Sequence, residues 1–101
     1  MYLVRFCYDV TPSDRDAVME LIRQEVEGAE AKNHQARLLV PLTRGAGGAA
    51  LEYELEISSL DALESFREQA IDSDEGATRE WMRRFSDLLV APPEVTVYRI
   101  D

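Results

Sequence analysis

The sequence contains a single cysteine and a single histidine, which limits the chemistry that its side chains can support. With Cys7 alone, neither a disulfide within the chain nor a thiolate metal site can form, and we expect no bound metal. No apolar run approaches the roughly 18 residues needed to cross a bilayer. No basic leader precedes an apolar segment either, so we expect a cytoplasmic protein that does not enter a membrane.

Positive charge is also scarce. Eleven Lys and Arg residues face twenty Asp and Glu residues, which gives a net charge of −9. Thirteen of the acids and five of the bases lie in residues 51–101. Such a balance repels phosphate backbones and anionic lipids, so nucleic acids and membrane surfaces are excluded as expected partners.

With 101 residues, the chain is short enough to form one domain spanning residues 1–101. A chain of this size buries only about two-thirds of the surface that its unfolded form exposes, so its core is modest. Contact with a second subunit would therefore add useful burial.

Alternation of apolar and polar residues, with a period of two, predicts four strands. In residues 2–10, Tyr2, Val4 and Phe6 share one face with Tyr8, while Arg5 lies on the other face. The remaining strands are expected at residues 36–42, 50–58 and 94–100. A short glycine-rich connection at residues 43–48 is too short for a crossover, so it should join antiparallel neighbours. It lacks the Lys-Ser/Thr ending of a phosphate-binding loop.

Helical spacing predicts three helical segments between these strands. Thr11 and Pro12 are typical of a helix start, and Gly28 suggests its end, with fraying through Lys32. Ser59 is expected to cap a second helix. The acidic run at residues 72–76 interrupts that helix and begins a third, which the prolines after Ala91 end. Asp72-Ser73-Asp74 is not a calcium loop, because Gly76 is one place early and Arg83 stands where the closing glutamate belongs.

The element order β-α-β-β-α-α-β indicates an α+β, ferredoxin-like split βαβ fold, with a four-stranded antiparallel sheet and all helices on one face. The apolar face of the sheet should lie under the helices. The opposite face carries Arg5, Arg37 and the row Glu52, Glu54 and Glu56, with Arg5 beside Glu54. This face is either solvated in a monomer or a charge-paired interface between two stacked sheets, with Arg5, Arg37 or Arg99 as partners of the acidic row. The small core favours the interface.

Hydrophobic spacing in the segments 51–57, 59–66, 80–89 and 94–99 follows a known pattern, although it includes no catalytic signature. In this spacing the whole chain resembles the dimeric α+β barrel superfamily, in its antibiotic biosynthesis monooxygenase (ABM) and NIPSNAP-like branch. The resemblance implies a homodimer formed by sheet-to-sheet stacking, with a small pocket between helices and sheet in each protomer. Members of the superfamily include cofactor-independent oxygenases, polyketide cyclases, haem-degrading enzymes and proteins without assigned activity.

The candidate substrate-binding site is made up of aromatic residues. We expect Tyr8, Tyr53, Phe66, Trp81 and Phe85 to bind a flat substrate in that pocket, with Tyr53 and Trp81 as catalytic candidates. The alternative is that these rings only fill the core. Haem degradation is disfavoured, because Asn33 and His34 adjoin each other away from the positions that the haem-degrading branch uses.

Three other residues have competing interpretations. Glu25 lies on the apolar stripe of the first helix, where desolvation would raise its pKa and suit it to general-base work; otherwise its carboxylate reaches water or an arginine. His34 is better explained as a surface loop residue than as a general base. Cys7 is expected to be a small apolar filler.

The predicted function is that of a small-molecule enzyme of specialised metabolism, a cofactor-independent monooxygenase or cyclase that acts on an aromatic or polyketide-like molecule. The alternative is a non-catalytic ligand-binding or accessory dimer.

Overall fold

A computed structural model describes residues 1–45, 48–65 and 75–101 of the chain. The elements are β1 (Tyr2–Tyr8), the 3-10 turn η1 (Pro12–Asp14), α1 (Arg15–Ala31), β2 (Gln35–Leu39), β3 (Leu51–Ile57), α3 (Glu75–Leu88) and β4 (Glu94–Arg99). A further helix, described over residues 60–65, lies between β3 and α3. The predicted order of elements is confirmed.

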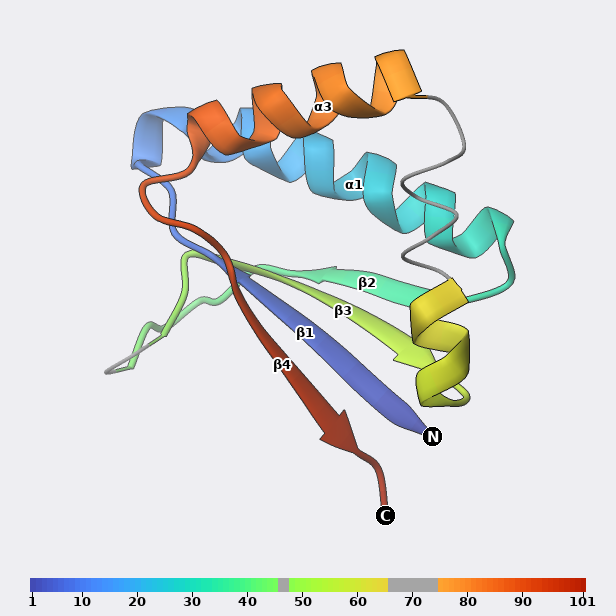
Figure 1. The fold of residues 1–101 in the computed structure, drawn as a ribbon. Coiled ribbons are helices and arrows are strands. Elements are labelled where there is room, and N and C mark those ends of the chain that lie inside the picture. The colour runs from blue at the N-terminus through green and yellow to red at the C-terminus, as the bar shows by residue number, and fades with distance from the viewer. Residues whose placement is uncertain (46–47, 66–74) are drawn as a thin grey trace.

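The four strands form one antiparallel sheet in the order β2-β3-β1-β4. β1 is therefore a central strand, paired with β3 on one side and β4 on the other. The prediction that the first and third strands are adjacent is confirmed, because β1 pairs with β3 and Arg5 lies directly opposite Glu54. Figure 1 shows α1 and α3 side by side over one face of the sheet, which leaves the opposite face open.

The core lies between this helical layer and the sheet. It draws alternate residues from β1 and β3, as a period of two requires, and residues three or four apart from α1. The largest fully buried side chains are Val4, Leu51, Leu55 and Ile57 of the sheet and Val18 and Ile22 of α1. The expectation that the apolar sheet face lies under the helices is thus confirmed.

The first helix departs from the sequence-based expectation at both ends. Pro12–Asp14 form a 3-10 turn, whose Asp14 N–H donates to the carbonyl of Thr11, before the α-helix begins at Arg15. Gly28 does not end the helix, which continues to Ala31. The chain reverses at Asn33, whose φ of 64° places it in the left-handed region that asparagine tolerates better than most residues.

All four strands are shorter than their alternation suggests. β1 ends at Tyr8, and Val10 forms an isolated bridge with Leu89. β2 ends at Leu39, so Val40 and Leu42 are exposed, Leu42 almost completely. The chain leaves the sheet here, and the side chains that continue the pattern have no layer to pack against.

Ser59 caps the following helix as expected, since its hydroxyl accepts a hydrogen bond from the Ala62 N–H at 3.1 Å. The proposed interruption falls mostly on residues 72–74, which lie outside the described residues, and α3 begins directly after them at Glu75. Among the helices in the described ranges, none is both long and apolar enough to cross a membrane.

β4 is the least covered strand. All six of its residues are exposed, including Val95 and Val97 on the helix side and Tyr98 on the open side. It is an edge strand, paired only with β1. Its apolar side chains therefore contribute little to the core of a single protomer.

Candidate functional site

A chain of aromatic rings connects α3 to the sheet. The Trp81 and Phe85 ring centroids are 5.1 Å apart, and Phe85 is 4.9 Å from Tyr8 on β1. The Phe6 ring then links Tyr8, at 6.4 Å, to Tyr53 on β3, at 5.5 Å. These separations are those of favourable aromatic pairs. The sequence-predicted residues Tyr8, Tyr53, Trp81 and Phe85 thus belong to one cluster.

The members of this cluster differ in burial. Tyr8, Tyr53 and Phe85 are buried, whereas Trp81 is half-buried and is not in direct ring contact with Tyr53. Phe66 lies outside the described residues, so its place beside the others stays a prediction. The sequence analysis did not select Phe6 as a site residue. Its position between Val4 and Tyr8 on the same alternating face could have indicated that it belongs to the cluster.

The two tyrosine hydroxyls are held in their neutral form. Burial is the main cause that raises the pKa of both phenols, and the nearby Glu25 carboxylate raises both further. The Tyr53 hydroxyl is fully buried and has no hydrogen-bond partner among the described residues. A buried donor without a partner costs about 1–3 kcal/mol, so a group that accepts from it would be bound favourably.

Glu25 lies on the stripe of α1 that faces the sheet, one turn from Leu21 and Ile22 and one turn from Ala29, all of which are buried. Its side chain is half-buried. Burial raises the pKa of its carboxyl, an effect that Lys32 partly opposes. Within the part of the chain that is described, no arginine pairs with it, so contact of the half-buried carboxylate with water stays the open alternative to general-base work.

On the open face, Glu54 is held between two arginines. The Arg5 Nε donates to Glu54 Oε1 at 2.9 Å, and the Arg37 Nε donates to Glu54 Oε2 at 2.7 Å. Burial alone would raise the pKa of this carboxyl, but the hydrogen bonds from both arginines outweigh it and hold the pKa below its usual range. The predicted partners Arg5 and Arg37 are confirmed for Glu54, while Arg99 pairs with Asp101.

The surroundings of this ion pair combine apolar and acidic groups. The Arg5 guanidinium lies over the Tyr98 ring, 5.3 Å from its centroid. Cys7 Sγ is 3.5 Å from Glu52 Oε1, and burial is the main cause that raises the pKa of this thiol. Cys7 is thus a weak donor to a neighbouring carboxylate, which its interpretation as an apolar filler did not include.

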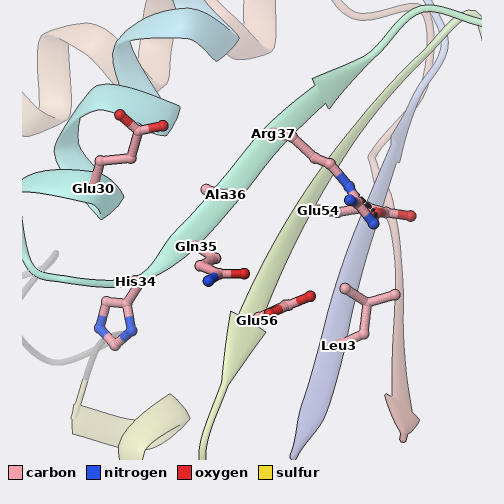
Figure 2. A pocket seen from close by; sticks show the side chains of 8 residues that line it. All are labelled: Leu3, Glu30, His34, Gln35, Ala36, Arg37, Glu54 and Glu56. Carbon is pink, nitrogen blue, oxygen red and sulfur yellow. Dashed lines mark hydrogen bonds and ion pairs between the residues drawn. The ribbon is translucent and has the colours of Figure 1, made fainter.

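A pocket of about 310 Å³ opens beside Glu54. Figure 2 shows Leu3, Gln35 and Glu56 bordering it from three strands, with Arg37 and Glu54 pointing toward each other at one side. His34, at the turn before β2, lines its other end and is half-buried. This pocket lies at the open sheet face, away from the aromatic cluster. Among the described residues, no three His, Cys, Asp or Glu side chains gather closely enough to hold a metal ion.

The fold defines a class of protein. A four-stranded antiparallel sheet covered on one face by helices, in this order, is the ferredoxin-like α+β fold. Within that class, the chain has the fold of antibiotic biosynthesis monooxygenase and NIPSNAP proteins, as its sequence pattern suggested.

This assignment of the fold rests on similarity to solved structures. An antibiotic biosynthesis monooxygenase aligns with a TM-score of 0.69 and 15% identity over 100% of this chain and 99% of its own. A NIPSNAP family protein from Agrobacterium tumefaciens aligns with a TM-score of 0.73 and 17% identity over 99% and 86%. Rv0793 from Mycobacterium tuberculosis aligns with a TM-score of 0.69 and 20% identity over 98% and 93%.

Neither a protein-family model nor a curated protein sequence matches the chain. At these identities the solved structures establish the fold, and the chemistry has to be argued from this chain's own residues.

Proposed function

We propose that the protein binds a flat aromatic or polyketide-like molecule between its helices and its sheet, and oxygenates or cyclises it without a cofactor in specialised metabolism. The observation that carries this proposal is the aromatic cluster that ends on the buried, unpartnered hydroxyl of Tyr53. Rings provide stacking surface, and the hydroxyl provides one directed hydrogen bond. The name of one structural relative, an antibiotic biosynthesis monooxygenase, supports the same direction.

In such a reaction the substrate supplies the electrons. A phenol such as α-naphthol (C₁₀H₈O) reacts with dioxygen to give naphthoquinone and water, so no external reductant is required. The protein would contribute position and exclusion of water. The Tyr53 hydroxyl, which its raised pKa keeps protonated, would donate to an oxygen of the substrate. Trp81 and Phe85 would cover the ring from α3.

We further propose that the protein works as a homodimer in which the open sheet faces stack, in the cytoplasm. This face carries Leu3, Leu39 and Tyr98 between its charged residues, and Glu54 is already neutralised within the protomer. Light scattering tests the proposal, and a monomer mass at micromolar concentration would contradict it.

A second function is favoured by one observation. Both phenols in the cluster have raised pKa values, so neither exchanges protons readily near neutral pH. The protein would then bind a ligand of the same class without transforming it, as an accessory dimer.

The experiment that tests the function uses α-naphthol as the probe. Binding is measured by calorimetry, and turnover is measured by oxygen uptake and naphthoquinone formation. We expect binding with slow turnover, and we expect Tyr53→Phe to weaken both. Tyr98→Phe is the matched control, because Tyr98 is on the opposite sheet face and should leave both unchanged. Binding without turnover supports the accessory function, and absence of binding contradicts both.

A further inference from the structure

The outer edge of β4 is unpaired among the described strands. β4 is the outermost strand in Figure 1 and bonds to β1 on one side only. The Ile100 N–H donates to the Met1 carbonyl at 2.9 Å, so even-numbered residues in this part of the chain direct their backbone groups toward β1. Because successive residues alternate in direction, Val95, Val97 and Arg99 direct their N–H and C=O groups away from the sheet. These groups form a row of backbone donors and acceptors along the edge.

The side chains of β4 suit a strand inside a sheet better than a strand at its edge. Val95 and Val97 lie on the helix side and Tyr98 lies on the open side, with exposed fractions of 52%, 45% and 43%. Edge strands commonly carry lysine, proline or a bulge that prevents pairing with another chain. β4 contains neither lysine nor proline, and its register with β1 runs without a bulge over its whole length. The edge is therefore open to a further strand.

We propose that the β4 edges of two copies of the chain pair with each other, antiparallel and about a two-fold axis at Val97. Val97 then lies opposite its own counterpart, and Val95 lies opposite Arg99 of the partner subunit. Each of these residue pairs exchanges two backbone hydrogen bonds, so every outward N–H and C=O group of the three residues is used. The two sheets become one continuous sheet, with the helices of both copies on the same side.

Charge favours a second copy of the chain as the occupant of this edge. Glu94 and Arg99 leave β4 without net charge, whereas the whole chain carries −9. In the proposed register Glu94 lies opposite Ile100 of the partner subunit, and Arg99 lies opposite Val95 of the partner subunit. No like charges are then opposite each other, and like charges directly opposite would destabilise the pair.

Symmetry also favours pairing of β4 with β4. The other outer strand of the sheet is β2. Pairing of β4 with β2 of another copy would be head-to-tail, so it would leave one free edge on each side and allow further copies to add. Two β4 strands make the same contact in both directions, which closes the assembly after two copies.

This pairing is independent of the proposed function. The stacked dimer buries the open face of the sheet, whereas the β4 pair uses the edge and leaves that face uncovered. If both form, the assembly contains four chains. Binding of α-naphthol between helices and sheet, or its absence, has no bearing on the edge.

Backbone hydrogen exchange, followed by NMR on the wild type, tests the pairing. Thr96 and Tyr98 direct their N–H groups toward β1, so they are protected with or without a partner. In a single protomer or in the stacked dimer, the outward N–H groups of Val95, Val97 and Arg99 face solvent and exchange rapidly. We expect the pairing to slow the exchange of these three groups by about tenfold or more. Rapid exchange of all three would overturn the proposal.

A matched pair of variants tests the same contact by mass. Val97→Pro removes an outward N–H, which an edge strand tolerates, and Val97→Ala shortens the side chain but keeps that N–H. We expect light scattering to show that Val97→Pro halves the particle mass and that Val97→Ala retains it. Circular dichroism checks that both variants fold. A folded Val97→Pro with the wild-type mass would overturn the proposal, as would a wild type of one chain, which would leave the edge to a strand of another protein.

Discussion

At the scale of single residues, the carboxylates of Glu54 and Glu25 are both removed from water, at least in part, and behave in opposite ways. Glu54 receives hydrogen bonds from two arginines, and its pKa is lowered; Glu25 has no such partners among the described residues, and its pKa is raised. The sequence predicted the first pairing, because the period of two and the antiparallel register place Arg5 opposite Glu54. It left Glu25 open, since periodicity shows on which face a residue lies and does not show whether a donor reaches it.

Replacement of Glu54 should destabilise the protein. Glu54→Gln removes the negative charge and replaces one of the two acceptor oxygens with an NH2 donor that faces an arginine, at a cost of about 2 kcal/mol in free energy of unfolding. Because the folded-state pKa of Glu54 is lowered, its contribution is present at neutral pH and is lost as the pH falls through that pKa. Urea denaturation at neutral and acidic pH measures both effects. Glu52→Gln, on the same strand and face, is the control, and an equal loss there would contradict the prediction.

Replacement of Glu25 should have the reverse effect. Its raised pKa means that the ionised form is less stable in the folded protein than in the unfolded chain, so the penalty grows as the pH rises through the folded-state pKa. Glu25→Gln should therefore stabilise the protein at neutral pH, on the order of 1 kcal/mol. The gain should vanish below about pH 4, where the carboxyl is protonated in both states. Thermal unfolding of this variant beside Glu27→Gln measures the difference, and destabilisation at neutral pH would show that Glu25 has a native partner.

At the scale of elements, the sequence predicted the number, type and order of helices and strands but not their ends. Alternation continues past Leu39 through Val40 and Leu42, and only the pairing with β3 shows where β2 stops. Gly28 was interpreted as a helix end because glycine is common there, yet α1 continues for three more residues. Tertiary packing of the buried stripe outweighs the local preference of one glycine.

Gly28 therefore offers a stabilising substitution. It lies inside α1, and a Cβ built on it meets nothing within 4 Å. Gly28→Ala should raise the free energy of unfolding by about 1 kcal/mol, because alanine loses less backbone entropy in a helix. Gly48→Ala is the contrasting variant, since its Cβ would lie 3.0 Å from the Gly45 carbonyl oxygen, and it should not stabilise. Chemical denaturation compares the two, and an unchanged midpoint for Gly28→Ala would contradict the prediction.

At the scale of the whole molecule, the fold and the site could be predicted from the sequence to different extents. The fold was predictable because hydrophobic spacing alone distinguishes it, whereas the site was predictable only in part. Ring positions on β1 and β3 follow from alternation, but whether a partner reaches the Tyr53 hydroxyl depends on how α1 crosses the sheet. Such a crossing is set by packing over the whole layer.

The proposed dimer should strengthen as salt is added. Each protomer carries a net charge of −9, and on the open face Glu54 pairs with Arg5 and Arg37 within the protomer, so Glu56 and Glu94 would add to the negative charge that the two stacked faces bring together. Dissolved salt screens this repulsion, and the Debye length at 0.1 M ionic strength is about 10 Å. Sedimentation equilibrium at low and physiological ionic strength measures the dissociation constant. A dimer that weakens with added salt would show that attraction between opposite charges, across the interface, dominates instead.

Trp81 is the one tryptophan of the chain, half-buried on α3 and in contact with Phe85 at the outer end of the aromatic cluster. The intrinsic fluorescence of the protein at wavelengths that excite only tryptophan therefore arises from this single position. The wavelength of its emission maximum reports how far water is excluded from the space between α3 and the sheet. Energy transfer from Trp81 to a ligand that absorbs at the emission wavelength would detect binding of that ligand beside the aromatic cluster, without a label on the protein.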